Sequence, residues 1–558
     1  MKKIYLIIYR QDVDLYCGLR GGGDFVAYYF DPTLADYIAL KGAESFNYIG
    51  RVSDFSPSFM QTKSRRCAVD FEIKINEVVK KYTVISNVVG WQHLTLRYFF
   101  LTYFWYSELW AEVAYKIPEG EVNIFVNNNP HYLNQNSYLP SVILMQHLSS
   151  IGRLYKAFLY GEVDYKVSDV LDVMGNVLEQ ECDLLVHLPT IIHDAKYIAT
   201  ELAGVNSIVN IKSKYWDTNT NNASIDINAV CTGNADFHNA GNLKEALALE
   251  IDELLSSYFS AHEFRRRQVK LLVDTLMSQV TNYFILDHYF SKNKPKKLLI
   301  SDHDAGLHGP ILQYCDKQEI EIFVFPHSKF ILDNGFNTRK TIYLNHSVQR
   351  SITSINSGAK PKSNLYFPIE KKLISTIVKS NNKKTIGLIL NGLSEGGVLN
   401  INFESYLSGI KILGAWCCLN SVIMKIRCRP DMPIRNFLSN LFFENENIII
   451  ESFENGLDEF IADIDLCIMY DIPTSASISI LNSKCPLINI MPVELDFWIS
   501  GWIDEDVVPV YSVPDGVAKL SGLLSTLDIF LENQQAEYNR RIGKSQGLKA
   551  IMFESRAW

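Results

Sequence analysis

The sequence lacks the closely spaced cysteines that metal centres and disulfide frameworks require. Its ten cysteines are scattered, none forms a CxxC pair, and the only close neighbours, Cys417 and Cys418, are adjacent. A zinc site or a disulfide framework is therefore not expected, and a reducing cytosol is the natural environment for such a chain. We predict a cytoplasmic protein.

Long hydrophobic runs are also missing. The most apolar window, residues 98–110, is 13 residues long, which is too short to span a bilayer. We interpret it as a buried core helix, and a face that touches membrane lipid is the alternative. At the N-terminus, Asp12 and Asp14 interrupt a short apolar run, and no small-residue cleavage site follows. Residues 4–8 are therefore expected to form a β-strand and not part of a signal peptide.

The chain has no surplus of positive charge. Its formal net charge is −9, with 47% hydrophobic and 21% charged residues. The acidic balance argues against nucleic-acid binding as the main function. A chain of 558 residues is too long for a single core, so two or more domains are expected.

The sequence does contain an alternation of strands and helices, which is clearest in its second half. The predicted strands there are residues 384–390, 421–428, 446–452, 465–470 and 486–491. Alternation at this spacing predicts a parallel, doubly wound sheet. Residues 297–325 read as strand, helix and strand, and a right-handed crossover would place both strands in one parallel sheet. Most of the first 290 residues carry no motif that can be assigned.

An acidic cluster follows the first strand of the 297–325 unit. Asp302 and Asp304 come directly after the apolar run, and His327 follows the next strand. The carboxyl ends of parallel strands share one edge of a sheet, where ligands bind. A carboxylate there can act as general base toward a hydroxyl, so Asp302 and Asp304 are candidates for the base. His327 is a candidate for orienting phosphate or acceptor; helix capping or a core position is the structural alternative.

Basic and hydroxyl side chains follow two strands of the second half. Arg427 and Arg429, with Pro430 after them, end one strand, and arginine pairs bidentately with phosphate or carboxylate. A surface salt bridge is the alternative. Thr474, Ser475 and Ser477 lie between a strand and a helix, where hydroxyls and first-turn amides can bind a phosphate. Plain helix capping uses the same residue types.

A glycine-containing turn, residues 391–397, follows the first strand of the second half. Glycine lets backbone amides approach a phosphate closely, so Asn391 and Gly392 are candidate nucleotide-binding residues. Glu395 is a candidate acceptor of hydrogen bonds from a ribose. The turn is neither a GxGxxG motif nor a P-loop, because no GK[ST] follows. An ordinary strand-to-helix turn is therefore an equal alternative.

These motifs together resemble those of GT-B glycosyltransferases. The nearest resemblance is to bacterial enzymes that use CMP-activated nonulosonic acids, namely Kdo transferases of capsule and lipopolysaccharide assembly and bacterial sialyltransferases. Their acidic, basic-proline and hydroxyl motifs are matched here by residues 302–306, 425–430 and 474–477. The relatives usually have histidine at the position of Arg429. The resemblance covers roughly residues 295–500.

The resemblance implies an α/β fold of the GT-B kind, with two Rossmann-like domains whose parallel sheets face a cleft. We expect four parts: an acceptor-side domain with helical additions at 1–340, an interdomain connection at 341–383, a nucleotide-sugar-binding domain at 384–530 and a helical tail at 531–558. A GT-B enzyme can stabilise the departing phosphate with arginines and a helix N-terminus. We therefore predict no essential metal ion and no cofactor besides the donor.

The function implied is transfer of a sugar from a nucleotide-sugar donor, CMP-linked in the favoured version, to a glycan or glycolipid acceptor of a bacterial surface. No nucleic-acid partner is expected, and a peripheral contact with the inner membrane is left open. Two alternatives keep the fold. One is a glycerol- or ribitol-phosphate transferase with a CDP donor, and the other is a non-catalytic glycan-binding subunit.

Overall fold

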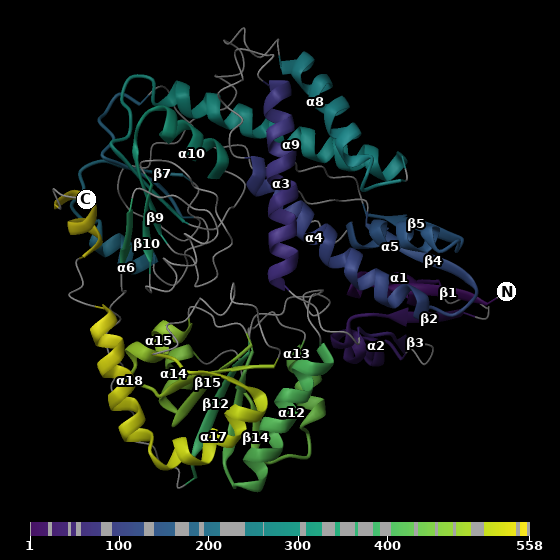
Figure 1. Cartoon of the computed structure of the whole chain (residues 1–558), viewed down its shortest axis with the longest axis vertical. Coiled ribbons are helices and arrows are strands. Elements are labelled where there is room, and N and C mark those ends of the chain that lie inside the picture. Colours follow the sequence, from purple (N-terminus) through teal and green to yellow (C-terminus); the bar gives the residue numbers. More distant parts are fainter. Residues whose placement is uncertain are drawn as a thin grey trace.

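Parallel β-sheets form the framework of the protein in the computed structural model, and three of them lie within the part of the chain that the structure describes (Figure 1). We call them the N-terminal, middle and C-terminal sheets. The described residues are 2–19, 25–42, 46–51, 57–79, 92–127, 139–161, 178–188, 195–211, 240–260, 262–301, 308–325, 341–345, 363–366, 383–390, 403–428, 434–451, 456–471, 476–492, 507–542 and 547–554.

The N-terminal sheet has the strand order β3-β2-β1-β4-β5, with all neighbours parallel. Its strands are β1 (Lys3–Ile7), β2 (Phe25–Tyr29), β3 (Phe46–Tyr48), β4 (Glu121–Asn127) and β5 (Tyr155–Tyr160). The accompanying helices are α1 (Arg10–Gly18), α2 (Ala35–Leu40), α3 (Pro57–Val79), α4 (Gln92–Val113) and α5 (Leu139–Ser150). The strand expected over residues 4–8 is therefore confirmed as β1.

Helix α4 contains the apolar window at residues 98–110, and its aromatic side chains lie inside the molecule. Phe99, Phe100 and Trp110 are buried in the same core as the inner faces of β1 and β4. The Trp110 indole Nε1–H donates to the Pro140 carbonyl at 2.8 Å, which ties α4 to α5. The interpretation as a core helix is confirmed. Over the described ranges, the structure contains no helix that is long and apolar enough to cross a membrane.

The middle sheet has the strand order β11-β10-β9-β8-β6-β7. Its strands are β6 (Leu184–His187), β7 (Ile208–Asn210), β8 (Lys297–Ser301), β9 (Glu321–Phe325), β10 (Thr341–Asn345) and β11 (Ser363–Tyr366). Its helices are α6 (Ala195–Glu201), α8 (Ala240–Leu255), α9 (His262–Tyr289) and α10 (His308–Lys317). β8 and β9 pair in parallel around α10, with Leu298 opposite Ile322, as the pattern at 297–325 predicts.

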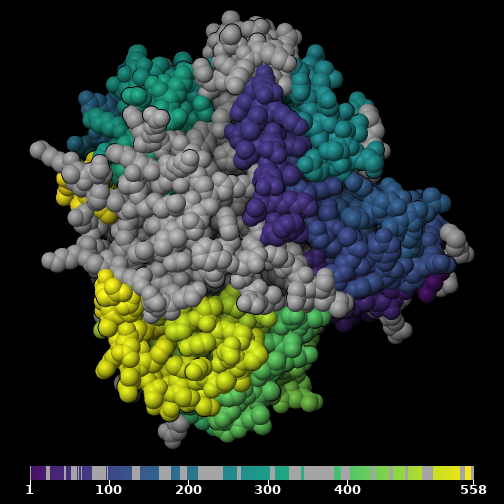
Figure 2. All heavy atoms as spheres, in the orientation of Figure 1, coloured from purple at the N-terminus to yellow at the C-terminus, as the bar shows by residue number. Residues whose placement is uncertain are grey.

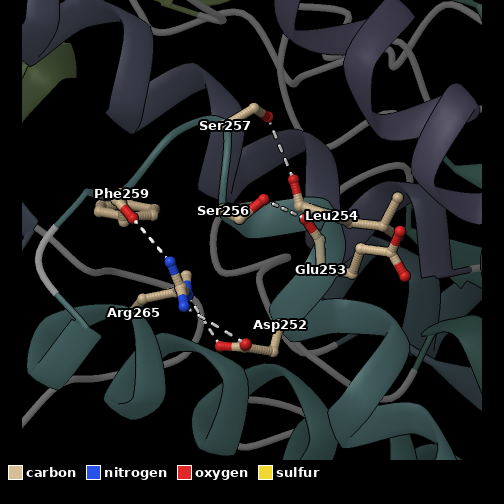
Figure 3. Close-up of polar contacts among 7 residues, drawn as sticks. All are labelled: Asp252, Glu253, Leu254, Ser256, Ser257, Phe259 and Arg265. Atoms are coloured by element: carbon tan, nitrogen blue, oxygen red, sulfur yellow. Dashed lines mark hydrogen bonds and ion pairs between the residues drawn. The ribbon is translucent and has the colours of Figure 1, made fainter.

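The corner between α8 and α9 is held by an arginine (Figure 3). Arg265 donates to the Asp252 carboxylate, with Nε to Oδ1 at 2.9 Å, and to the Phe259 carbonyl at 3.3 Å. Ser256 and Ser257 donate to carbonyls in the last turn of α8. In the space-filling view, α3 forms a surface column beside α8 (Figure 2).

The C-terminal sheet has the strand order β14-β13-β12-β15-β16-β17. Its strands are β12 (Thr385–Leu390), β13 (Ile423–Arg427), β14 (Ile448–Ile450), β15 (Leu466–Tyr470), β16 (Leu487–Met491) and β17 (Val510–Ser512). Its helices are α12 (Phe403–Leu419), α13 (Ile434–Leu441), α14 (Leu457–Ala462), α15 (Ala476–Asn482), α17 (Val513–Ser525) and α18 (Leu527–Ile542). All five strands predicted in this half are confirmed.

Glycine in the central strand β12 lets a helix approach the C-terminal sheet. A Cβ atom at Gly387 would lie 2.5 Å from Ile464 Cδ1 and 2.9 Å from Phe460 Cζ. These two side chains belong to α14 and the turn that follows it. The opposite face of the sheet packs on α12 and α17 through Ile386 and Leu388. The sheet is therefore covered on both faces, as expected for a doubly wound parallel sheet.

Three features show how the sheets are distributed along the chain. Residues 1–340 hold the whole N-terminal sheet and, after it in the chain, four strands of the middle sheet, β6 to β9. Within 341–383, β10 and β11 extend the middle sheet. At the end of the tail, a π-helical turn (Ala550–Glu554) packs on the middle sheet, where Ile551 and Met552 share a core with Leu184. The Lys297 ammonium also donates to the Met552 carbonyl.

The N-terminal sheet touches the C-terminal domain at the start of α12. The Tyr48 hydroxyl donates to Glu404 Oε1 at 3.0 Å, and Asn440 Nδ2 donates to Asp36 Oδ1 at 2.6 Å. The second contact joins α13 to α2, which lie side by side (Figure 1). The predicted fold class, α/β with Rossmann-like parallel sheets, is confirmed.

Candidate functional site

The strand order of the C-terminal sheet reverses direction between β12 and β15. β13 and β14 lie on one side of β12, whereas β15, β16 and β17 lie on the other. Ligands of such sheets bind outside the carboxyl ends of the strands at this switch point. The register keeps these ends level, since Ile389 pairs with Arg427 and Leu390 pairs with Tyr470. Side chains at the ends of β12, β13 and β15 therefore define the candidate nucleotide site.

Arg427 is the last residue of β13 and lies at this edge. Its guanidinium lies over the Phe460 ring, 5.6 Å from the ring centroid. Nη1 is buried, and among the described residues the side chain makes no hydrogen bond or ion pair. Burial lowers the pKa of Arg427 from its ordinary value, and the charge of Glu451 opposes this effect. A partly desolvated cation without an ion pair is stabilised when an anion reaches it.

Glu451, the acid whose charge acts most strongly on Arg427, is paired with a neighbouring lysine. Lys425 Nζ lies 3.2 Å from Glu451 Oε1 and 3.1 Å from Asp463 Oδ2. Burial lowers the pKa of Lys425, but the hydrogen bonds to Asp463 and Glu451 outweigh burial and raise it above its usual value. Lys425 and Arg427 alternate with buried residues on the same face of β13, and Glu451 forms its ion pair with Lys425.

Asp471 follows β15 directly and has a backbone conformation that is unusual for a residue with a side chain. Its φ is +65°, in the left-handed region, and the residue is 7% exposed. Its amide donates to the Ile490 carbonyl at 2.9 Å. Asn489, in the amide orientation that satisfies both side-chain atoms, donates to the Asp471 carbonyl at 3.3 Å. Non-glycine residues held in this region cluster at functional sites.

Tyr406 lies in the first turns of α12, against Asp471 and Tyr470. The rings of Tyr406 and Tyr470 are 5.0 Å apart and edge-on, and the Tyr470 hydroxyl donates to the Tyr406 carbonyl at 2.6 Å. The Tyr406 hydroxyl is buried and has no hydrogen-bond partner among the described residues. Burial, followed by the charge of Asp471, holds the pKa of Tyr406 well above its ordinary value. Tyr406 therefore stays protonated and can donate a hydrogen bond.

Most of the nucleotide-binding residues predicted from the sequence lie outside the described residues. Ser477 is described: it lies in the first turn of α15 and is 0% exposed. Arg427 thus ends β13, whereas Ser477 lies in the helix that follows β15, and the role of both residues in binding stays a prediction. The predicted residues outside the described part are Asn391, Gly392, Glu395, Arg429, Pro430, Thr474 and Ser475.

The middle sheet has its own switch point, between β6 and β8. β7 lies beyond β6, whereas β9, β10 and β11 lie beyond β8. Ser301 is the last residue of β8, so Asp302 and Asp304 follow the strand at this point of the sheet. Asp302, Asp304 and His327 lie outside the described residues. Their catalytic role stays a prediction, but the strand end that precedes the two acids is at the position where parallel sheets bind ligands.

Two histidines that the sequence does not mark lie buried at the same edge. His187 ends β6 and His308 begins α10, and their rings are 5.0 Å apart. His187 Nδ1 lies 2.9 Å from the Ile211 carbonyl oxygen, and His308 Nε2 lies 2.9 Å from the Ser301 carbonyl oxygen. His187 could have been found from the sequence, because it lies at the end of an apolar run, as Asp302 does after the run at 298–300.

The switch point of the N-terminal sheet, between β1 and β4, is occupied by the protein's own carboxylate. Asp12 Oδ2 accepts hydrogen bonds from the amides of Ile8 at 2.9 Å and Tyr9 at 3.0 Å. Asp12 is buried. The amides that a phosphate would use after β1 are thus already bonded to an anion. The C-terminal and middle sheets are therefore the better candidates for ligand binding.

Cysteine and metal chemistry finds no support in the described part of the chain. Nine cysteines lie there, all without a disulfide. Burial raises the pKa of Cys182, Cys417 and Cys428 to about 12, so these thiols stay protonated and unreactive. The same ranges contain no group of three or more histidine, cysteine, aspartate or glutamate residues that could hold a metal ion.

Comparisons with known proteins find similar solved structures at low identity, and they show no family for this chain. No family model and no curated protein matches it. Similar solved structures include a UDP-GlcNAc 2-epimerase from Methanocaldococcus jannaschii in complex with UDP-GlcNAc and UDP (11% identity, TM-score 0.36, covering 66% of this chain and 98% of that one). The UDP-GlcNAc 2-epimerase from Neisseria meningitidis bound to UDP-GlcNAc has 10% identity and a TM-score of 0.37, covering 66% of this chain and 98% of that one. The glycosyltransferase SnogD from Streptomyces nogalater has 10% identity and a TM-score of 0.36, covering 65% and 95%. At these values no residue role is transferred from those proteins to this chain.

Proposed function

We propose that the protein is a nucleotide-sugar-dependent glycosyltransferase whose nucleotide binds at the carboxyl edge of the C-terminal sheet. The observation that carries the proposal is Arg427, a half-buried side chain at the end of β13 whose buried Nη1 has no hydrogen-bond partner among the described residues. A nucleotide diphosphate or monophosphate would supply the missing anion. Arginine binds phosphate through paired N–H donors, which makes it suited to this task.

The second wall of the proposed site is the edge of the middle sheet, where Asp302 and Asp304 follow β8. One of these carboxylates would remove the proton from the acceptor hydroxyl, while the nucleotide leaves from the Arg427 side. The acceptor is a glycan or glycolipid, as the resemblance in residues 302–306 and 474–477 implies. Closure of the two domains would exclude water and protect the donor from hydrolysis.

The proposed donor carries a CMP-linked nonulosonic acid, because the motifs of residues 425–430 and 474–477 resemble those of enzymes with that donor. Two other donor classes have to be compared with it. CDP-alditols are used by relatives with similar motifs, and UDP-GlcNAc is bound by the epimerases named above. The experiment below therefore compares nucleotides before any sugar is chosen.

Thermal unfolding in the presence of CMP, CDP, UDP and GDP tests the proposal. A nucleotide that binds only the folded chain stabilises it by about 2.7 kcal/mol at 100 times its Kd. We expect a selective rise in Tm with one nucleotide, and the loss of that rise in Arg427→Met. Because Arg427 makes no hydrogen bond or ion pair among the described residues and methionine can still pack on the Phe460 ring, the variant without nucleotide should be about as stable as the wild type.

Arg266→Met is the matched control, because Arg266 is exposed on α9 and far from the C-terminal sheet in the chain. It should keep the nucleotide response. If no nucleotide changes the Tm of the wild-type protein, the proposal fails. If Arg427→Met responds as the wild type does, the site is not at the end of β13.

A further inference from the structure

The two buried histidines of the middle sheet are each fixed in one tautomer by a backbone carbonyl. A carbonyl oxygen can only accept, so the ring nitrogen facing it carries the hydrogen. His187 therefore donates from Nδ1 to the Ile211 oxygen at 2.9 Å, and His308 donates from Nε2 to the Ser301 oxygen at 2.9 Å. In the neutral rings, the lone pair is consequently on Nε2 of His187 and on Nδ1 of His308.

The surroundings of each ring hold it firmly. Ile211, which follows β7, makes two hydrogen bonds to the end of β6. Its amide donates to the Val186 carbonyl at 2.8 Å, and its carbonyl accepts from His187. Ser301 Oγ lies 3.2 Å from His308 Nε2, so His308 contacts both the carbonyl and the side chain of the last residue of β8. Exposure is 1% for His187 and 0% for His308. Such burial places both rings behind the edge of the sheet, away from direct contact with a substrate.

We infer that His187 and His308 are positioning residues that fix Ser301, the residue from which the chain leaves β8 toward the proposed catalytic carboxylates of Asp302 and Asp304. The inference rests on the proposed function, which gives those carboxylates their catalytic role. Ser301, which His308 holds, is bonded directly to Asp302. The 5.0 Å ring contact couples His308 to His187, which the end of β7 anchors in turn. Misplacing a catalytic group by about 1 Å can cost 100-fold in rate.

Amide side chains test this inference, because their nitrogens mimic one imidazole nitrogen each. Asparagine places its N–H₂ near the position of histidine Nδ1, and glutamine places its N–H₂ near that of Nε2. His187→Asn and His308→Gln therefore keep the donor that each carbonyl needs, whereas His187→Gln and His308→Asn move it. The four variants form matched pairs that are alike in size, polarity and charge but differ in where the donor lies.

Two readouts are measured on the full-length protein. The first is amide hydrogen exchange of the peptide covering residues 297–317. The second is nucleotide release from CMP-N-acetylneuraminate, CMP-Kdo and UDP-GlcNAc. We expect the crossed variants, His187→Gln and His308→Asn, to exchange faster and to release nucleotide about 10–100-fold more slowly than their matched partners. The fall should be in kcat with little change in KM, because the proposed nucleotide site is on the other sheet.

The outcomes separate the alternatives. If matched and crossed variants exchange and turn over alike, the inference is wrong. Equal and complete loss of turnover in His187→Asn and His187→Gln, with exchange unchanged, would overturn it in favour of a proton-transfer role for the ring. If the wild-type protein releases no nucleotide from any donor, the proposed function fails instead, and hydrogen exchange still decides whether the histidines fix the end of β8.

Discussion

Replacing Gly409 by alanine should weaken the C-terminal sheet, although alanine is the better helix former. Gly409 lies on α12, and a Cβ atom there would come well within 3.0 Å of the Tyr470 hydroxyl and 2.9 Å from Val513 Cγ2. Tyr470 is fully buried and donates to the Tyr406 carbonyl at 2.6 Å. The hydroxyl therefore cannot move aside without breaking that bond.

The size of the effect follows from three contributions. Alanine gains about 1 kcal/mol over glycine within a helix. Overpacking a buried contact costs about 1–3 kcal/mol, and leaving the Tyr470 hydroxyl unpaired costs about 1–3 kcal/mol. The net loss is about 1–5 kcal/mol, which corresponds to roughly 5- to 4000-fold faster amide exchange, at about 1.4 kcal/mol for each factor of ten.

Hydrogen exchange of the full-length protein measures this loss domain by domain, which a single melting curve of a multidomain chain does not. Peptides from α12 and β15 should exchange faster in Gly409→Ala. Gly522→Ala on α17 is the control: nothing lies within 4 Å of its Cβ position, so this variant should gain about 0.5–1 kcal/mol.

A double variant gives the decisive comparison. Tyr470→Phe removes the hydroxyl that alanine would meet, so Gly409→Ala should cost less in the Tyr470→Phe background than in the wild type. Equal costs in the two backgrounds, or unchanged exchange in Gly409→Ala, would refute the reasoning.

Three other changes have defined outcomes. Asp471→Gly should be tolerated or stabilising in urea unfolding, whereas Asp471→Val should cost about 1–3 kcal/mol, because only glycine adopts a φ of +65° freely; equal effects would contradict this. Arg265→Ala should speed exchange in peptides from α8 and α9, whereas Arg266→Ala, an exposed neighbour, should not. Because the folded-state pKa of Lys425 is raised, its ion pairs should stabilise the protein fully below the unfolded pKa of about 10.5 and lose this effect as the pH rises through the folded-state value; Lys425→Met should then abolish that part of the alkaline loss of stability.

The sequence predicts the C-terminal sheet well and the N-terminal sheet poorly, for a physical reason. β12 and β15 are buried on both faces and appear as continuous apolar runs that end in turn residues. β3 has only three residues, and 72 residues lie between the end of β3 and the start of β4. Helices α3 and α4 fill that interval. Sequence pattern alone does not reveal that strands so far apart share a sheet.

The candidate sites divide in the same way. Arg427 and Asp302 can be found because they end or follow an apolar run, so their place at a sheet edge follows from the strand itself. Tyr406 could not be found, because its contact with Tyr470 joins residues 64 positions apart. Asp471 could not be found either, since its significance is in a backbone angle. His187 depends on a carbonyl 24 residues further along the chain.

The return of the chain's end to the middle sheet has a consequence for biosynthesis. Ile551 and Met552 complete a core with Leu184 that the ribosome began to supply hundreds of residues earlier. At about 5–20 residues per second, the interval between the emergence of β11 and that of this last turn is on the order of tens of seconds. During that time the apolar surface under the π-helical turn is uncovered, so a nascent chain stalled before residue 547 should be a better client for chaperones than the finished protein.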